Sequence, residues 1–122
     1  MYWEVRYDIA KILGCIGSFE IIPDLTEMLK DEDKITIRSA VRSLCYSRNE
    51  KAIELLSMEL KNKKLRDTIL WEMSFNATEE NLKKWGKNEN LKKVLGEISK
   101  KEKIDYLGLA KRLLEDINKT YP

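Results

Sequence analysis

The chain has 122 residues, with 23 Lys and Arg against 21 Asp and Glu and no His, so its formal net charge is +2 at pH 7. This length suits one domain with its own core, and the near balance of charges excludes disorder driven by net charge. Without histidine, the chain lacks the commonest general base and the commonest metal ligand, so we expect no catalytic triad, metal site or cofactor. Few Gly and Pro among many Leu, Ile, Lys and Glu predict an all-α fold.

Helical hairpins are predicted along the chain from the spacing of apolar residues. The first helix covers about Trp3 to Gly14 and the second ends near Lys30, which makes residues 3–30 the first hairpin. Their apolar stripes recur every three to four residues. These residues are Val5, Ile9, Ile12, Leu13 and Ile16, then Ile22, Leu25, Met28 and Leu29.

Three further hairpins are predicted at about 34–62, 63–86 and 88–120. The acidic turn Asp31-Glu32-Asp33 can cap the third helix, and Thr78 is the predicted N-cap of the sixth. When the third hairpin is aligned with the first, Leu82 and Trp85 take the core positions that Ile22 and Leu25 hold in the first. The last helix is predicted from these apolar residues: Ile104, Leu107, Leu109, Ala110, Leu113, Leu114 and Ile117.

The two cysteines and the hydropathy pattern indicate an ordinary intracellular domain. Cys15 and Cys45 fall in apolar helical runs without metal-ligand spacing, so both are predicted to be buried small hydrophobes. No secretory signal and no stretch of about 20 apolar residues is present. We therefore expect a cytoplasmic protein with no membrane partner.

The stretch from Val5 to Arg38 begins and ends with an aliphatic residue followed by arginine, which indicates one period of a repeat. Val5-Arg6-x-x-Ile9-Ala10-x-Ile12-Leu13-Gly14-x-Ile16-Gly17 is followed by Ile21-Ile22-Pro23-x-Leu25 and Leu29, then by Asp31, Asp33 and Ile37-Arg38. This pattern, with a period in the low thirties, resembles the HEAT repeat, specifically the short variety first noted in phycobilisome lyases and common in prokaryotes. The match is strong over residues 5–44 and weakens towards Trp85.

The resemblance implies an alpha-alpha superhelix, a HEAT-like helical-hairpin solenoid of about eight helices that forms a single domain over residues 1–122. It also implies a structural ladder of charged residues along the stack. Asp31 or Asp33 would pair with Arg38, and Arg6 would take the same role at the start of the chain. These pairs hold the register of the repeats and are not catalytic.

A partner-binding face follows from the same resemblance, because second helices line the concave side of such arrays. The predicted binding residues lie opposite the apolar stripes: Glu20, Asp24 and Glu27 on the second helix, Glu54, Ser57 and Lys61 on the fourth, and Lys84 on the sixth. The predicted function is a non-catalytic scaffold that binds another protein there. The plainer alternative is a solvated face without a partner.

The N-terminal end is a second predicted contact surface. Trp3 and Tyr7 stand at helical spacing in a first repeat that no capping hairpin precedes, which favours a partner or a homodimer at this end. The alternative is that Trp3 folds back as a hydrophobic staple of the first helix.

Charge is distributed unevenly and suggests an alternative function. Residues 1–61 hold nine Lys and Arg against eleven Asp and Glu, whereas the remainder holds fourteen against ten. Many of the excess lysines fall between Lys83 and Lys103. This region is the alternative prediction, a nucleic-acid surface, although it contains no Arg and its lysines are spread over several helix faces.

Overall fold

The computed structural model describes residues 21–101 and 103–121, and every structural statement below concerns these residues. They form seven α-helices and one 3-10 turn. The elements are α2 (Ile21–Met28), α3 (Lys34–Tyr46), α4 (Glu50–Glu59), α5 (Arg66–Phe75), α6 (Glu79–Gly86), α7 (Glu89–Ser99), η1 (Tyr106–Gly108) and α8 (Leu109–Thr120). The predicted all-α fold is therefore confirmed for the described residues. The predicted helix Trp3–Gly14 lies outside them.

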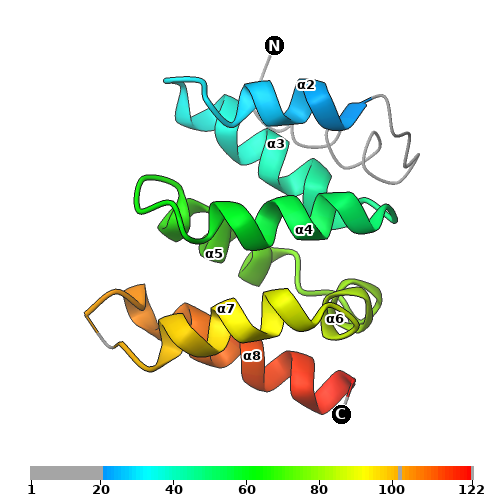
Figure 1. The fold of residues 1–122 in the computed structure, drawn as a ribbon, viewed down its shortest axis with the longest axis vertical. Helices are drawn as coiled ribbons and strands as arrows, with labels where there is room; N and C mark the ends of the chain where they lie inside the picture. Colours follow the sequence, from blue (N-terminus) through cyan, green and yellow to red (C-terminus); the bar gives the residue numbers. More distant parts are fainter. Residues whose placement is uncertain (1–20, 102, 122) are drawn as a thin grey trace.

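The helices form two layers (Figure 1). α2, α4 and α7 lie one above another in the front layer, and α3, α5 and α8 lie behind them. α3 packs against α2, α4 and α5, whereas α8 packs against α5, α6 and α7. α4 and α7 pack directly against each other, so the front layer is continuous from the middle of the chain to its C-terminal part.

α6 departs from the regular alternation that the sequence pattern predicts. It is seen nearly end-on in Figure 1 and packs mainly against α8 and α7, while α7 takes the place beside α4. Trp85 is fully buried in α6, which confirms a core position. The backbone of Gly86 lies so close to Tyr121 that an added Cβ would sit 2.6 Å from the Tyr121 Cβ. Trp85 and this close approach hold the short helix against α8 rather than along α4.

Side-chain caps begin four of the helices, which explains why they start where they do. The side chains of Asp33, Asn49, Thr78 and Asn88 accept hydrogen bonds from backbone N–H groups at the starts of α3, α4, α6 and α7. Each such cap stabilises its helix by about 0.5–2 kcal/mol. The predicted caps at the acidic turn and at Thr78 are thus confirmed.

The start of α8 differs from the prediction. Leu107, expected on its apolar face, is 60% exposed and precedes the helix with φ +55°, a left-handed conformation. The buried Asp105 carboxylate accepts hydrogen bonds from the backbone N–H groups of Ala110 and Lys111, and Gly108 is also left-handed. These bonds tie Asp105 to the first turn of α8, so the intervening residues turn outwards and the helix begins at Leu109.

Leu107→Gly is expected to raise the free energy of unfolding. A left-handed conformation costs a residue with a side chain about 1–2 kcal/mol, and glycine avoids this cost. The exposed leucine side chain contributes little burial, so the net gain is about 0.5–1 kcal/mol after the extra entropy of glycine in the unfolded chain. Urea denaturation followed by circular dichroism measures the gain, and a loss of stability would contradict the backbone conformation.

Candidate functional site

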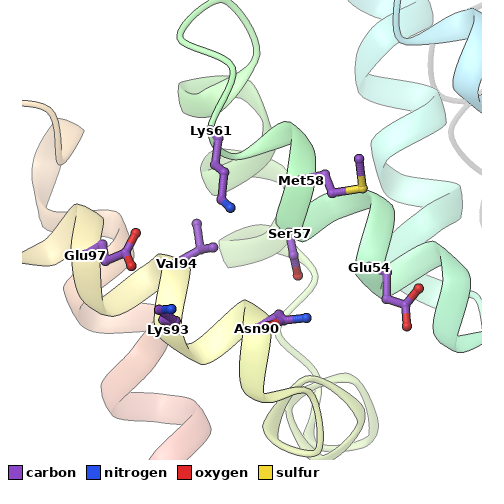
Figure 2. Close-up of a pocket in the computed structure, with 8 residues that line it drawn as sticks. All are labelled: Glu54, Ser57, Met58, Lys61, Asn90, Lys93, Val94 and Glu97. Carbon is purple, nitrogen blue, oxygen red and sulfur yellow. The ribbon is translucent and has the colours of Figure 1, made fainter.

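A groove between α4 and α7 is the candidate functional site, and it contains three of the predicted binding residues. Glu54, Ser57 and Lys61 come from the α4 side, and α7 forms the opposite wall. The groove has a volume of about 280 Å³. Figure 2 shows the full set of lining residues, which are Glu54, Ser57, Met58, Lys61, Asn90, Lys93, Val94 and Glu97.

Two of the residues that line the groove, Met58 and Val94, are apolar, and the others are polar or charged. Val94 is 6% exposed at its base, whereas Met58 is 66% exposed on the α4 side. Met58 is flexible and polarisable, a side chain that adapts to different apolar surfaces. Glu54 and Lys61 lie at opposite ends of the α4 wall (Figure 2). Charges of both signs beside two apolar side chains can favour one orientation of a bound amphipathic segment.

Ser57 has a structural role in the wall of this groove. Its side chain is buried, and its hydroxyl donates to the Ile53 carbonyl one turn earlier, at 2.9 Å. The prediction placed Ser57 on the face opposite the apolar stripe, but it is only 4% exposed and lies on the side of α4 that faces α7 across the groove. Ser57 therefore lets α7 approach α4 closely, as a small residue does.

A second cavity, of about 340 Å³, adjoins the groove at the N-terminal ends of α4 and α7. It shares Asn90 with the first, and its lining includes the basic side chains of Arg48, Lys84 and Lys87 alongside Glu50. Together the two cavities follow the line between α4 and α7 along most of α4.

Lys84, predicted to bind a partner, stabilises the end of α3. Its ammonium donates to the carbonyls of Cys45 and Ser47, at 3.0 and 2.9 Å. Carbonyls at a helix C-terminus lack hydrogen-bond donors within the helix and carry partial negative charge. A lysine there donates hydrogen bonds to them and compensates this charge. α6 is thereby tied to the corner between α3 and α4.

The predicted residues of the first hairpin are only partly described. Asp24 and Glu27 are exposed on α2, and Glu27 forms an exposed ion pair with Lys30. Both belong to α2 and do not line the α4–α7 groove. Glu20, Trp3, Tyr7 and Arg6 lie outside the described residues, and their predicted roles are not tested.

The structure gives Arg38 a partner that the sequence pattern did not single out. Its Nε donates to Glu72 Oε1 of α5 at 2.8 Å, and the Glu72 side chain is only 3% exposed. Asp33 caps α3, and the Asp31 carboxylate accepts from the Asp33 backbone N–H at 2.8 Å. The ladder between these aspartates and Arg38 stays a prediction. The only sequence signal for Glu72 was a charge between Trp71 and Met73 in an apolar run.

The lysines between residues 83 and 103 do not share one surface. Lys83 and Lys92 form exposed or half-exposed ion pairs with Glu79 and Glu89 on their own helices. Lys84 binds the end of α3, Lys87 lines the second cavity and Lys93 lines the groove. The other lysines lie at the end of α7 and in the loop that follows it. A continuous nucleic-acid surface requires basic residues clustered on one face, which this distribution does not supply.

Cys45 is fully buried, as predicted, and burial raises the pKa of its thiol far above the usual range, with the Glu72 carboxylate adding to the rise. Among residues 21–101 and 103–121 no group of three or more potential metal-ligating side chains occurs. The thiol therefore stays protonated in the folded protein at physiological pH and behaves as a small apolar group.

This raised pKa predicts a loss of stability at alkaline pH. Above about pH 8.5 the thiol of the unfolded chain ionises while that of the folded protein does not. The unfolded state then binds fewer protons, so stability falls as pH rises, by up to about 1.4 kcal/mol per unit. Urea midpoints at pH 8, 9 and 10, under reducing conditions, should fall more steeply for the wild type than for Cys45→Ala. Equal slopes would contradict the burial of the thiol.

None of the helices in the described ranges combines the length and hydropathy of a membrane-spanning segment. Comparison of the chain with protein-family models, with curated proteins and with solved structures gives no match in any of the three.

Proposed function

We propose that this chain is a non-catalytic protein-interaction module, built as a HEAT-like superhelix, that binds a partner protein through the face formed by the second helices. The observation that supports it most is the α4–α7 groove, with Met58 exposed, Val94 buried and charged side chains among its lining residues. Three of its lining residues were expected at a binding face from the repeat pattern. α2 and α4, the second helices of the first two predicted hairpins, lie in one layer as in such an array, and α7 takes the place beside α4 that the pattern gave to α6 (Figure 1).

An amphipathic helix is the form of partner that suits this groove. Helix-in-groove recognition uses one to three apolar anchors at helical spacing, with polar residues outside them. Met58 and Val94 provide a seat for one such anchor, and Glu54 and Lys61 at opposite ends distinguish the two orientations of a charged partner helix. The cytoplasmic location and the contact at the N-terminal end are parts of the same proposal.

Site-specific photo-crosslinking tests the groove directly. The full chain is purified with a photoreactive residue at position 58, added to a cell lysate of the source organism and irradiated. We expect it to crosslink one discrete partner. The matched control places the same residue at Glu115, which is exposed on α8. Crosslinks of equal pattern from both positions would contradict a specific groove.

Met58→Asp is expected to weaken binding of that purified partner at least tenfold. Removing a central apolar anchor and placing a charge against it costs a binding interface about 2 kcal/mol or more. Because Met58 is exposed, the free energy of unfolding should change by less than about 0.5 kcal/mol. Isothermal titration calorimetry measures the affinity, and Glu115→Lys serves as the surface control. Unchanged affinity for Met58→Asp would rule out the groove as the binding site.

A further inference from the structure

Two lysine-rich loops lie at the same edge of the molecule, at one end of the α4–α7 groove. The α4–α5 loop and the loop between α7 and α8 both emerge at the left of Figure 1. Lys61 and Glu97 line one groove, which also brings the end of α4 near the end of α7. All the lysines of the two loops are exposed, and they are Lys61, Lys63, Lys64, Lys100, Lys101 and Lys103. We call these six residues the lysine edge.

Two large apolar side chains project from the same edge. Tyr106 is 54% exposed and Leu107 is 60% exposed, and only Ile104 and Asp105 separate them from Lys103. The acidic turn at 31–33 lies at this end of the stack too, next to the α4–α5 loop. The α7–α8 loop is therefore the part of the edge where basic and apolar side chains coincide.

This loop is built to hold its apolar tip outwards. The Asp105 carboxylate, 7% exposed, accepts two backbone N–H groups from the first turn of α8 at 2.8 and 3.2 Å. Leu107 keeps its unfavourable left-handed backbone, which turns its side chain away from the core that Leu109 and Leu113 enter. Because the Leu107 backbone is strained and its side chain is exposed, the leucine does not stabilise the fold. This combination is typical of a residue that contacts an apolar surface outside the protein.

We propose that the lysine edge docks on an anionic lipid bilayer, with Tyr106 and Leu107 entering the interface between headgroups and acyl chains. Tyrosine suits the interfacial region of a membrane, and leucine suits the adjoining apolar boundary. Each lysine near an anionic surface strengthens binding about fivefold, so three to six of them act together. A lipid surface accounts for Leu107 better than nucleic acid does, because an aliphatic side chain offers neither stacking nor hydrogen bonding to a base.

Co-sedimentation of the full chain with vesicles tests this docking. The chain is expected to bind vesicles of phosphatidylcholine with 30% phosphatidylserine at least tenfold more tightly than vesicles of phosphatidylcholine alone. The substitutions Lys100→Gln, Lys101→Gln and Lys103→Gln together should weaken binding about 100-fold, the product of three fivefold effects. The same charge change at exposed positions elsewhere, Lys51→Gln, Lys87→Gln and Lys119→Gln, is the control and should weaken binding less than tenfold.

Leu107→Gly separates insertion from simple charge attraction. It removes the apolar tip without a folding penalty, because glycine adopts the left-handed conformation freely, and it should weaken vesicle binding about fivefold. A 20-nucleotide single-stranded DNA and RNA are assayed in parallel. Nucleic-acid binding that exceeds vesicle binding and is the same for Leu107→Gly and wild type would replace the lipid proposal. Absent vesicle binding, equal binding to both vesicle types, or an equal effect of both triple variants would also overturn it.

Discussion

Trp85→Ala is expected to lower the free energy of unfolding by about 3–5 kcal/mol, the usual cost of removing a large buried aromatic side chain. Trp85 is the largest fully buried side chain among the described residues, and it anchors the eight-residue α6 against α7 and α8. A helix of this length is not stable by itself, so its position depends on such an anchor. Urea denaturation followed by circular dichroism measures the loss.

Two variants accompany this substitution as controls. Phe75→Ala removes an aromatic side chain that is 70% exposed on α5, and it should cost less than about 1 kcal/mol. Trp85→Phe should cost less than Trp85→Ala because it retains most of the volume. It also removes an indole N–H that has no hydrogen-bond partner among the described residues. If Trp85→Ala cost no more than Phe75→Ala, the anchoring role of Trp85 would be wrong.

Arg38→Met is expected to cost about 3 kcal/mol, because it removes the charged partner of a buried carboxylate. Arg38 Nε and Glu72 Oε1 lie 2.8 Å apart, with the Glu72 side chain 3% exposed and that of Arg38 40% exposed. Asn76 Nδ2 also lies 3.4 Å from the other carboxylate oxygen. An amide cannot replace a guanidinium in compensating a negative charge, so the buried carboxylate loses its short charge-assisted hydrogen bond.

The double-mutant cycle of this pair distinguishes an ion pair from simple packing. Glu72→Gln should cost less than Arg38→Met, since the half-exposed guanidinium that remains can be hydrated. Combining Arg38→Met with Glu72→Gln should recover part of the loss, because no buried charge is then left. Equal and additive effects of the two single substitutions would show that the pair is not coupled.

Helices, caps and core positions of the described residues followed from local rules. Apolar spacing identified the stretches that became α2 to α8, and residues such as Asp33 and Thr78 marked where helices begin. Such signals are local, because a cap involves only the next three residues and an apolar stripe needs only one helix. The burial of Cys45 and Trp85 was predictable for the same reason.

The start of α8 was not predictable from apolar spacing, because Leu107 satisfies the helical pattern. Its exclusion from the helix depends on the Asp105 carboxylate, whose bonds to the next backbone segment turn the preceding residues outwards. The candidate groove likewise could be predicted only in part from the pattern within single helices. The repeat pattern placed Glu54 and Lys61 on a binding face, but the residues of its other wall, such as Lys93 and Val94, were not assigned to it.

The sequence by itself determined that the described residues are helical, the approximate extent of each described helix and the exposure of Glu54 and Lys61. Only the tertiary structure decided that α7, not α6, lies beside α4, that Arg38 meets Glu72, and that Lys84 binds the end of α3. The physical reason is the distance along the chain. Arg38 and Glu72 are 34 residues apart, and Lys84 and Cys45 are 39 apart. Such contacts depend on how the helices pack against one another. The spacing of apolar residues within one helix does not contain that information.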